Sequence, residues 1–186
     1  MKIILPLVLL LFFFCSCGSD NNKQKKEDEQ NVITQTGLLL DVSFPTSQGS
    51  SSYDIYVPEK YNPEQKWPLV IFLDPHAKGC DPVIMYTPLA EKYGFIIAGS
   101  NFIENNQQPA VQIGHVRSLI NELKGKYSIY KMRICLAGFS GGARTAVSCA
   151  MNIPGISTVI GCGGGFPQVD KPITNRFDYI GMAGDE

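Results

Sequence analysis

The chain has 186 residues, a formal net charge of −1 and 44% hydrophobic residues, an ordinary composition for a globular protein. The near-zero net charge and the lack of any basic stripe in the sequence argue against nucleic acid as a partner.

The first stretch of the chain resembles a bacterial export signal. A lysine precedes an apolar run over residues 3–14, which has signal-peptide length and is short for a membrane span. A small residue directly before Cys17 resembles a lipobox, whereas a bulky residue before Cys15 makes that cysteine the weaker candidate. We expect a lipoprotein signal peptide over residues 1–17, with Cys17 lipidated and the protein anchored to the membrane in the bacterial cell envelope. An ordinary cleaved signal peptide or an uncleaved anchor is the alternative.

Residues 18–36 form a different kind of segment. Most of them are polar, charges of both signs are mixed, and no hydrophobic period appears before residue 32. Such composition is typical of a flexible tether. The rest of the chain, residues 37–186, has the length of one domain.

Short apolar runs alternate with helical patterns along this domain. The predicted strands cover residues 37–44, 53–57, 67–73, 95–99, 134–137, 156–160 and 177–183. The predicted helices are a short one with Thr87 as N-cap and Pro88 at its first position, ending before Gly94, then residues 110–127, and a third from Ala143. This alternation predicts an α/β fold with a mostly parallel sheet and helices on both faces.

The most informative stretch is GFSGG at residues 138–142, a match to G-x-S-x-G. A buried strand precedes it and a helix follows it, which is the setting of a nucleophile elbow. We expect Ser140 to have strained backbone geometry, with other chain passing close to Gly138 and Gly142, which lack a Cβ. A glycine-rich turn with an incidental serine is the alternative interpretation.

The segments FLDPHAKG, LAEKYGFIIAGSN and GFSGGAR, in this order, resemble an α/β-hydrolase. Within that superfamily the chain is most similar to secreted esterases of the polyhydroxybutyrate-depolymerase, feruloyl-esterase and dienelactone-hydrolase type, as found among bacterial lipoproteins. The resemblance covers roughly residues 37–186 and implies a serine hydrolase that works through an acyl-enzyme.

The resemblance assigns roles to individual residues. Ser140 would be the nucleophile, and the backbone N–H of Gly141 would donate to the oxyanion. The family takes its second oxyanion donor from the loop after the third strand. Because Pro75 in that loop has no N–H, the donor here would be the backbone of His76 or Ala77.

The remaining triad members are less well matched. The family's order is serine, acid, histidine, and Asp185 lies close to the expected place of the acid, but no histidine follows it. The chain has only His76, on the correct rim, and His115, within a helical pattern. Both are more typical of structural roles than of a general base. The resemblance therefore implies a domain that is incomplete at its C-terminus and a serine with little activation.

The sequence thus predicts a carboxylic ester hydrolase acting on a small-molecule or polysaccharide-linked ester. A non-catalytic lipoprotein that binds a glycan or acyl ligand, or a serine peptidase of the same fold, is the alternative. No cofactor is expected, because serine hydrolysis needs none. No metal is expected either, because Cys80, Cys135, Cys149 and Cys162 form no C-x-x-C pair, although a disulfide between Cys80 and Cys162 is compatible with the pattern.

Overall fold

The computed structural model describes residues 35–168 and 172–184. The predicted signal peptide, the predicted lipidation site Cys17, almost all of the predicted tether and the candidate acid Asp185 lie outside the described residues. In the described part, no helix is both long and apolar enough to cross a lipid bilayer.

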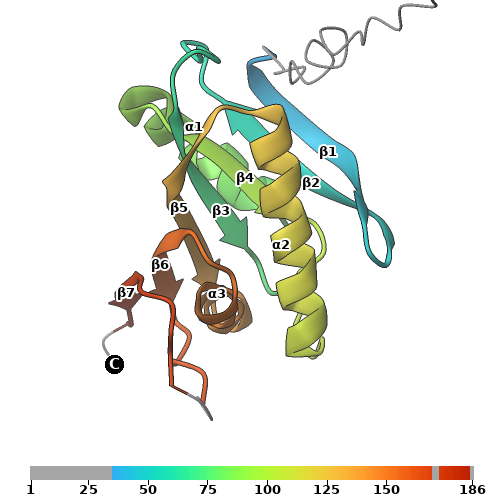
Figure 1. Ribbon diagram of the computed structural model, residues 1–186, viewed down its shortest axis with the longest axis vertical. Coiled ribbons are helices and arrows are strands. Elements are labelled where there is room, and N and C mark those ends of the chain that lie inside the picture. Colours follow the sequence, from blue (N-terminus) through green and yellow to red (C-terminus); the bar gives the residue numbers. More distant parts are fainter. Residues whose placement is uncertain (1–34, 169–171, 185–186) are drawn as a thin grey trace, which may run out of the picture. The chain divides into compact units, whose positions relative to one another are not determined.

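The described part forms one sheet with three helices (Figure 1). The strands are β1 (Gly37–Thr46), β2 (Gly49–Val57), β3 (Trp67–Leu73), β4 (Ile96–Ser100), β5 (Ile129–Phe139), β6 (Ile156–Cys162) and β7 (Asp178–Met182). The helices are α1 (Cys80–Tyr93), α2 (Pro109–Lys126) and α3 (Gly141–Asn152).

The sheet has the strand order β1-β2-β4-β3-β5-β6-β7. The hairpin of β1 and β2 pairs antiparallel, and every pair from β4 to β7 is parallel. The prediction of a mostly parallel sheet is confirmed, and β3 lies at its centre, as its uninterrupted apolar run indicates.

The helices lie on both faces of the sheet, also as predicted. α1 packs on β2 and β4, whereas α3 packs on β3, β5 and β6 and is flanked by α2. The direction of each connection explains this. The β3-to-β4 connection steps toward the hairpin, while the connections that end in β5 and β6 step toward β7. Right-handed crossovers in opposite directions place their helices on opposite faces.

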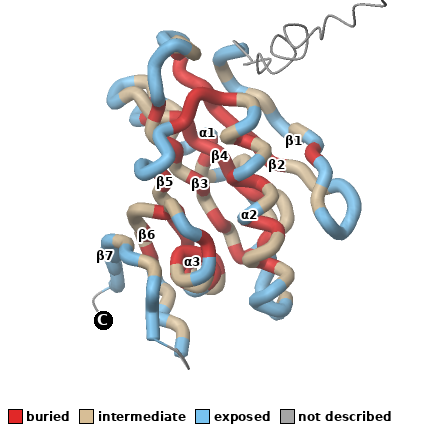
Figure 2. The backbone as a smooth tube through the Cα atoms, in the orientation of Figure 1, coloured by how far each residue is buried: buried red, intermediate tan, exposed pale blue. Residues whose placement is uncertain are grey.

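Burial differs between the two faces of the sheet (Figure 2). Along β3, the residues that face α2 and α3 are fully or almost fully buried, among them Leu69, Ile71 and Leu73. The alternate residues Val70 and Phe72, on the α1 face, are only half-buried. All five residues of β7 are exposed. The main core therefore lies between the sheet and the α2–α3 face.

One predicted helix boundary is wrong. α1 does not begin at Thr87 with Pro88 in its first turn; it begins at Cys80, and Pro88 lies inside it. The Thr87 hydroxyl donates to the Val83 carbonyl one turn earlier, at 2.9 Å, so this threonine bonds within a helix instead of capping one. The end before Gly94 is confirmed, because Gly94 has the left-handed conformation (φ 73°) that ends helices.

Candidate functional site

The strand–turn–helix around Ser140 is present as predicted. β5 ends at Phe139, α3 begins at Gly141, and Ser140 joins them. Ser140 has φ 50° and ψ −115°, a conformation that residues with a Cβ rarely adopt. Its backbone N–H donates to the carbonyl of Cys162 at 2.8 Å, which ties the turn to the end of β6. The strained turn is therefore held in place from the neighbouring strand.

Close backbone approach explains the glycines around this turn. A Cβ on Gly142 would overlap the carbonyl oxygen of Leu73 in β3, and a Cβ on Gly138 would overlap the backbone of Gly142. Gly164, in the glycine run after β6, lies equally close to the carbonyl of Ser140. The first two contacts confirm the expected close approach. The third contact shows that the glycine run lets the chain after β6 pass close to Ser140, which its sequence alone does not reveal.

The start of α3 offers hydrogen-bond donors beside Ser140. The first residues of a helix have backbone N–H groups without an intrahelical acceptor, and the helix dipole adds partial positive charge there. Among the described residues, the Gly141 N–H makes no backbone hydrogen bond. The side chain of Ser140 likewise makes no hydrogen bond within the described part. Both groups are available to a ligand.

The loop after β3 does not supply the second backbone donor that the resemblance implies. The His76 N–H donates to the Asp74 carboxylate at 2.8 Å, and the Ala77 N–H donates to the Ile103 carbonyl at 2.9 Å. Ala77 has φ 58°, so this loop is strained like the elbow. Because both N–H groups are already engaged within the protein, the structure argues against His76 and Ala77 as oxyanion donors.

The two histidines of the chain have different environments. His115 is only 5% exposed; its Nε2 lies 3.2 Å from the Ser100 hydroxyl and its ring stacks on Phe102. Burial lowers the pKa of His115 to about 4, so the imidazole is neutral at pH 7. The His76 side chain is 67% exposed, and its Nδ1 lies 3.5 Å from a carboxylate oxygen of Asp74. Neither imidazole hydrogen-bonds to Ser140 in the described structure.

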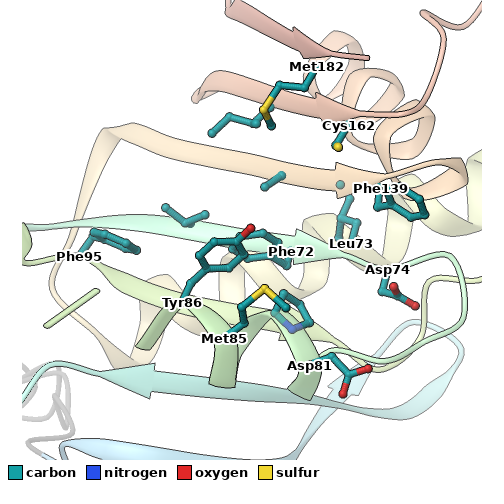
Figure 3. A pocket seen from close by; sticks show the side chains of 15 residues that line it. Phe72, Leu73, Asp74, Asp81, Met85, Tyr86, Phe95, Phe139, Cys162 and Met182 are labelled. Atoms are coloured by element: carbon teal, nitrogen blue, oxygen red, sulfur yellow. The ribbon is translucent and has the colours of Figure 1, made fainter. Parts of the chain in front are cut away.

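A cavity of about 710 Å³ lies on the α1 face of the sheet, next to the elbow. Met85 and Tyr86 of α1 line it together with Phe72 of β3 (Figure 3), and the ring of Tyr86 stacks on that of Phe72 with centroids 5.0 Å apart. Its walls are almost entirely apolar. Asp74 lies at the end of the cavity where Phe139 and the elbow are found. The cavity thus offers apolar surface close to the serine.

No protein-family model matches the sequence, and neither does any curated protein. Solved structures do match it. The feruloyl esterase module of Clostridium thermocellum, in complex with sinapinate, is 17% identical with a TM-score of 0.59 over 76% of this chain. A thermostable esterase is 21% identical with a TM-score of 0.55 over 69% of it. A dienelactone hydrolase-like promiscuous phosphotriesterase from metagenomic libraries is 13% identical with a TM-score of 0.59 over 72% of it.

These similarities and the strand order decide the fold. The chain has the α/β-hydrolase fold. It spans 59%, 41% and 63% of the length of those three chains, respectively.

Within this hydrolase fold, Asn101 has a structural role and the cysteines form no cross-link. Asn101 accepts a hydrogen bond from the Gly79 N–H at 3.1 Å and donates to Ser52, so it caps a loop. The four cysteines of the described domain are free thiols, Cys80 and Cys162 included. Within residues 35–168 and 172–184, no three His, Cys, Asp or Glu side chains converge as a metal ion would require.

Sequence reasoning missed the ordered loop between β4 and α2, which it treated only as polar. The buried Ile103 anchors this loop, and Gln107 bonds across it to the Phe102 carbonyl at 2.9 Å. Asn105 from the same loop lies against Gly141 of the elbow. Two adjacent apolar residues, Phe102 and Ile103, inside a polar run were the only signal for this arrangement.

Proposed function

We propose that this protein is a serine hydrolase of esterase type with Ser140 as its nucleophile. The observation that carries the proposal is the strained φ of 50° at Ser140, immediately before a helix whose first N–H has no acceptor within the described part. Backbone strain at a non-glycine residue is retained where function requires it. Here the strained turn places the Ser140 hydroxyl beside a backbone N–H that can donate a hydrogen bond to a developing negative charge.

The proposed reaction is acyl transfer. The Oγ of Ser140 attacks the ester carbonyl carbon, an O–C bond forms, and the carbonyl π electrons move onto the carbonyl oxygen, which accepts a hydrogen bond from the Gly141 N–H. The Oγ proton leaves to a base. As the tetrahedral species collapses, the carbonyl re-forms and the C–O bond to the leaving group breaks. The leaving oxygen takes back a proton from the protonated base and departs as the alcohol, and water then hydrolyses the acyl-enzyme to the acid and free Ser140.

The proposed reaction needs a general base, and neither histidine hydrogen-bonds to Ser140 within the described part. His115 is buried against Ser100, and His76 is exposed and paired with Asp74. With no imidazole bonded to Ser140 in the described residues, we expect water to accept the proton and turnover to be slow. A site lacking its triad base retains roughly 10³–10⁴-fold acceleration over water from binding and the oxyanion hole.

The proposed substrates are small-molecule or polysaccharide-linked esters. The names of two similar structures, a feruloyl esterase module and a thermostable esterase, support this class. The lipid anchor at Cys17 and the location in the bacterial cell envelope belong to the same proposal and are supported by the sequence alone.

A second candidate is a protein that binds an acyl ligand without turning it over. The apolar cavity of about 710 Å³ next to the elbow favours it, and so does the lack of an imidazole on Ser140 within the described part. Release of the alcohol distinguishes the two candidates, since only the hydrolase catalyses it.

Hydrolysis of p-nitrophenyl esters of increasing acyl length tests the proposal. We expect release of p-nitrophenol above the buffer rate, lost in Ser140→Ala. Ser148→Ala is the matched control, because Ser148 lies on the same helix away from the turn, and it should keep the wild-type rate within about two-fold. If Ser140→Ala hydrolyses the esters as fast as the wild type, the proposed function is wrong.

A further inference from the structure

The oxyanion hole has one free backbone donor and needs another. Gly141 provides a free N–H, but in the loop after β3 Pro75 has no N–H, and those of His76 and Ala77 are already used. Oxyanion holes act through donors that converge on the developing charge, and removing one donor typically costs roughly 10²–10³ in kcat. A side chain that reaches the same place would complete the site.

Asn105 reaches this place. A Cβ on Gly141 would overlap the amide oxygen Oδ1 of the Asn105 carboxamide and would lie 3.4 Å from the Cβ of Pro75. The carboxamide therefore occupies the space beside the Cα of Gly141, one bond from the free N–H. Asn105 is exposed, and its side chain makes no hydrogen bond within the described part. It faces the elbow with its hydrogen-bonding capacity unused.

The loop that carries Asn105 is fixed to both sides of the site. The Asn105 N–H donates to the Pro75 carbonyl at 2.9 Å, which joins it to the loop after β3. Buried Gln112 of α2 donates to the Glu104 carbonyl at 2.8 Å and accepts from the Thr145 hydroxyl at 3.0 Å. Because Thr145 belongs to α3, the backbone beside Asn105 is linked to the helix that begins at the elbow. The carboxamide is thus presented from a rigid support.

We propose that Asn105 is a catalytic residue whose Nδ2 is the second oxyanion donor. This inference rests on the proposed function. The acceptor end of the carboxamide, Oδ1, faces Gly141, and a half-turn of the terminal group brings the donor Nδ2 to the same place when an anion forms there. As Ser140 attacks, the negative charge on the former carbonyl oxygen lies between the Gly141 N–H and Nδ2. No bond of Asn105 breaks, and it keeps both of its protons.

The experiment compares p-nitrophenyl ester hydrolysis by the wild type, Asn105→Ala and Asn105→Asp. We expect kcat to fall about 100-fold in Asn105→Ala with little change in KM, because the donor acts on the transition state. Asn105→Asp should lose at least as much, since a carboxylate repels the anion. Asn106→Gly, one residue along the same loop at a position with φ 67° that glycine adopts without strain, should stay within about two-fold of wild type. Asn105→Ala with more than half of the wild-type kcat would overturn the proposal.

A thionoester analogue separates catalysis from structural support. Sulphur accepts hydrogen bonds more weakly than oxygen, so the wild type should prefer the oxygen ester and Asn105→Ala should lose most of that preference. An equal loss on both substrates, together with a lowered Tm, would mean that Asn105 only supports the loop and would overturn the assignment.

The two proposals fail in different ways. Full activity in Ser140→Ala would refute the proposed function. Activity that depends on Ser140 but is unchanged by Asn105→Ala would refute the oxyanion assignment alone.

Discussion

At the scale of single residues, the site depends on where hydrogen-bonding groups are already satisfied. The Ser140 hydroxyl and the Gly141 N–H make no hydrogen bond within the described part, whereas the N–H groups of His76 and Ala77 do. These hydrogen bonds cannot be predicted from a motif, because they depend on which carbonyl or carboxylate lies next to each amide in the folded protein. His115 shows the same principle in the core: its Nε2 faces the Ser100 hydroxyl and its ring lies between aromatic rings.

The buried His115 should make stability depend on pH. Its pKa is about 4 in the folded protein and about 6.5 in an unfolded chain, so between these values the unfolded state binds more protons. Its contribution to stability is complete above pH 6.5 and is lost as pH falls toward 4. At about 1.4 kcal/mol per pKa unit, the loss is about 3 kcal/mol.

Urea unfolding between pH 4 and pH 7 measures this contribution in comparison with His115→Gln. The difference between wild type and variant isolates His115 from carboxylates that titrate in the same range. We expect the wild type to lose stability more steeply than the variant as pH falls. Identical slopes in the two proteins would show that His115 is not the titrating group.

At the scale of elements, the elbow depends on how closely α3 approaches β3. The sequence predicted this part well, because G-x-S-x-G between an apolar run and a helical pattern has few other structural solutions. It predicted the start of α1 badly, because Thr87-Pro88 suits both a helix start and a helix interior, and tertiary packing decides between them. The loop with Asn105 could not be predicted, since Gln107 and Gln112 fix it through contacts that have no local sequence signature.

Gly142 and Gly114 provide a matched test of the close contact between α3 and β3. A Cβ on Gly142 would overlap the Leu73 carbonyl, whereas a Cβ on Gly114 of α2 would meet nothing within 4 Å. We expect Gly142→Ala to lower the free energy of unfolding by about 1–3 kcal/mol through overpacking. Gly114→Ala should raise it by about 0.5–1 kcal/mol, since alanine favours helix. Urea denaturation checks both, and an unchanged stability in Gly142→Ala would contradict the observed contact.

At the scale of the whole molecule, the sheet is covered unequally. α2 and α3 bury one face, whereas α1 packs mainly on β2 and β4, so the apolar cavity lies on the α1 face against β3, β5 and β6. The direction of the crossovers accounts for this, because each connection that steps toward β7 places its helix on the other face. Ser140 lies at the carboxyl ends of the parallel strands, where ligands bind in open α/β sheets.

Covalent labelling with a fluorophosphonate tests most directly the proposal that the elbow presents Ser140 as a nucleophile. Cleavage after Arg133 and Arg144 yields the peptide Ile134–Arg144, in which Ser140 is the only hydroxyl-bearing residue. We expect mass spectrometry to find the phosphonyl adduct on this peptide in the native protein and not after unfolding in urea. A native protein that stays unlabelled, or that is labelled equally on other serine-containing peptides, would contradict it.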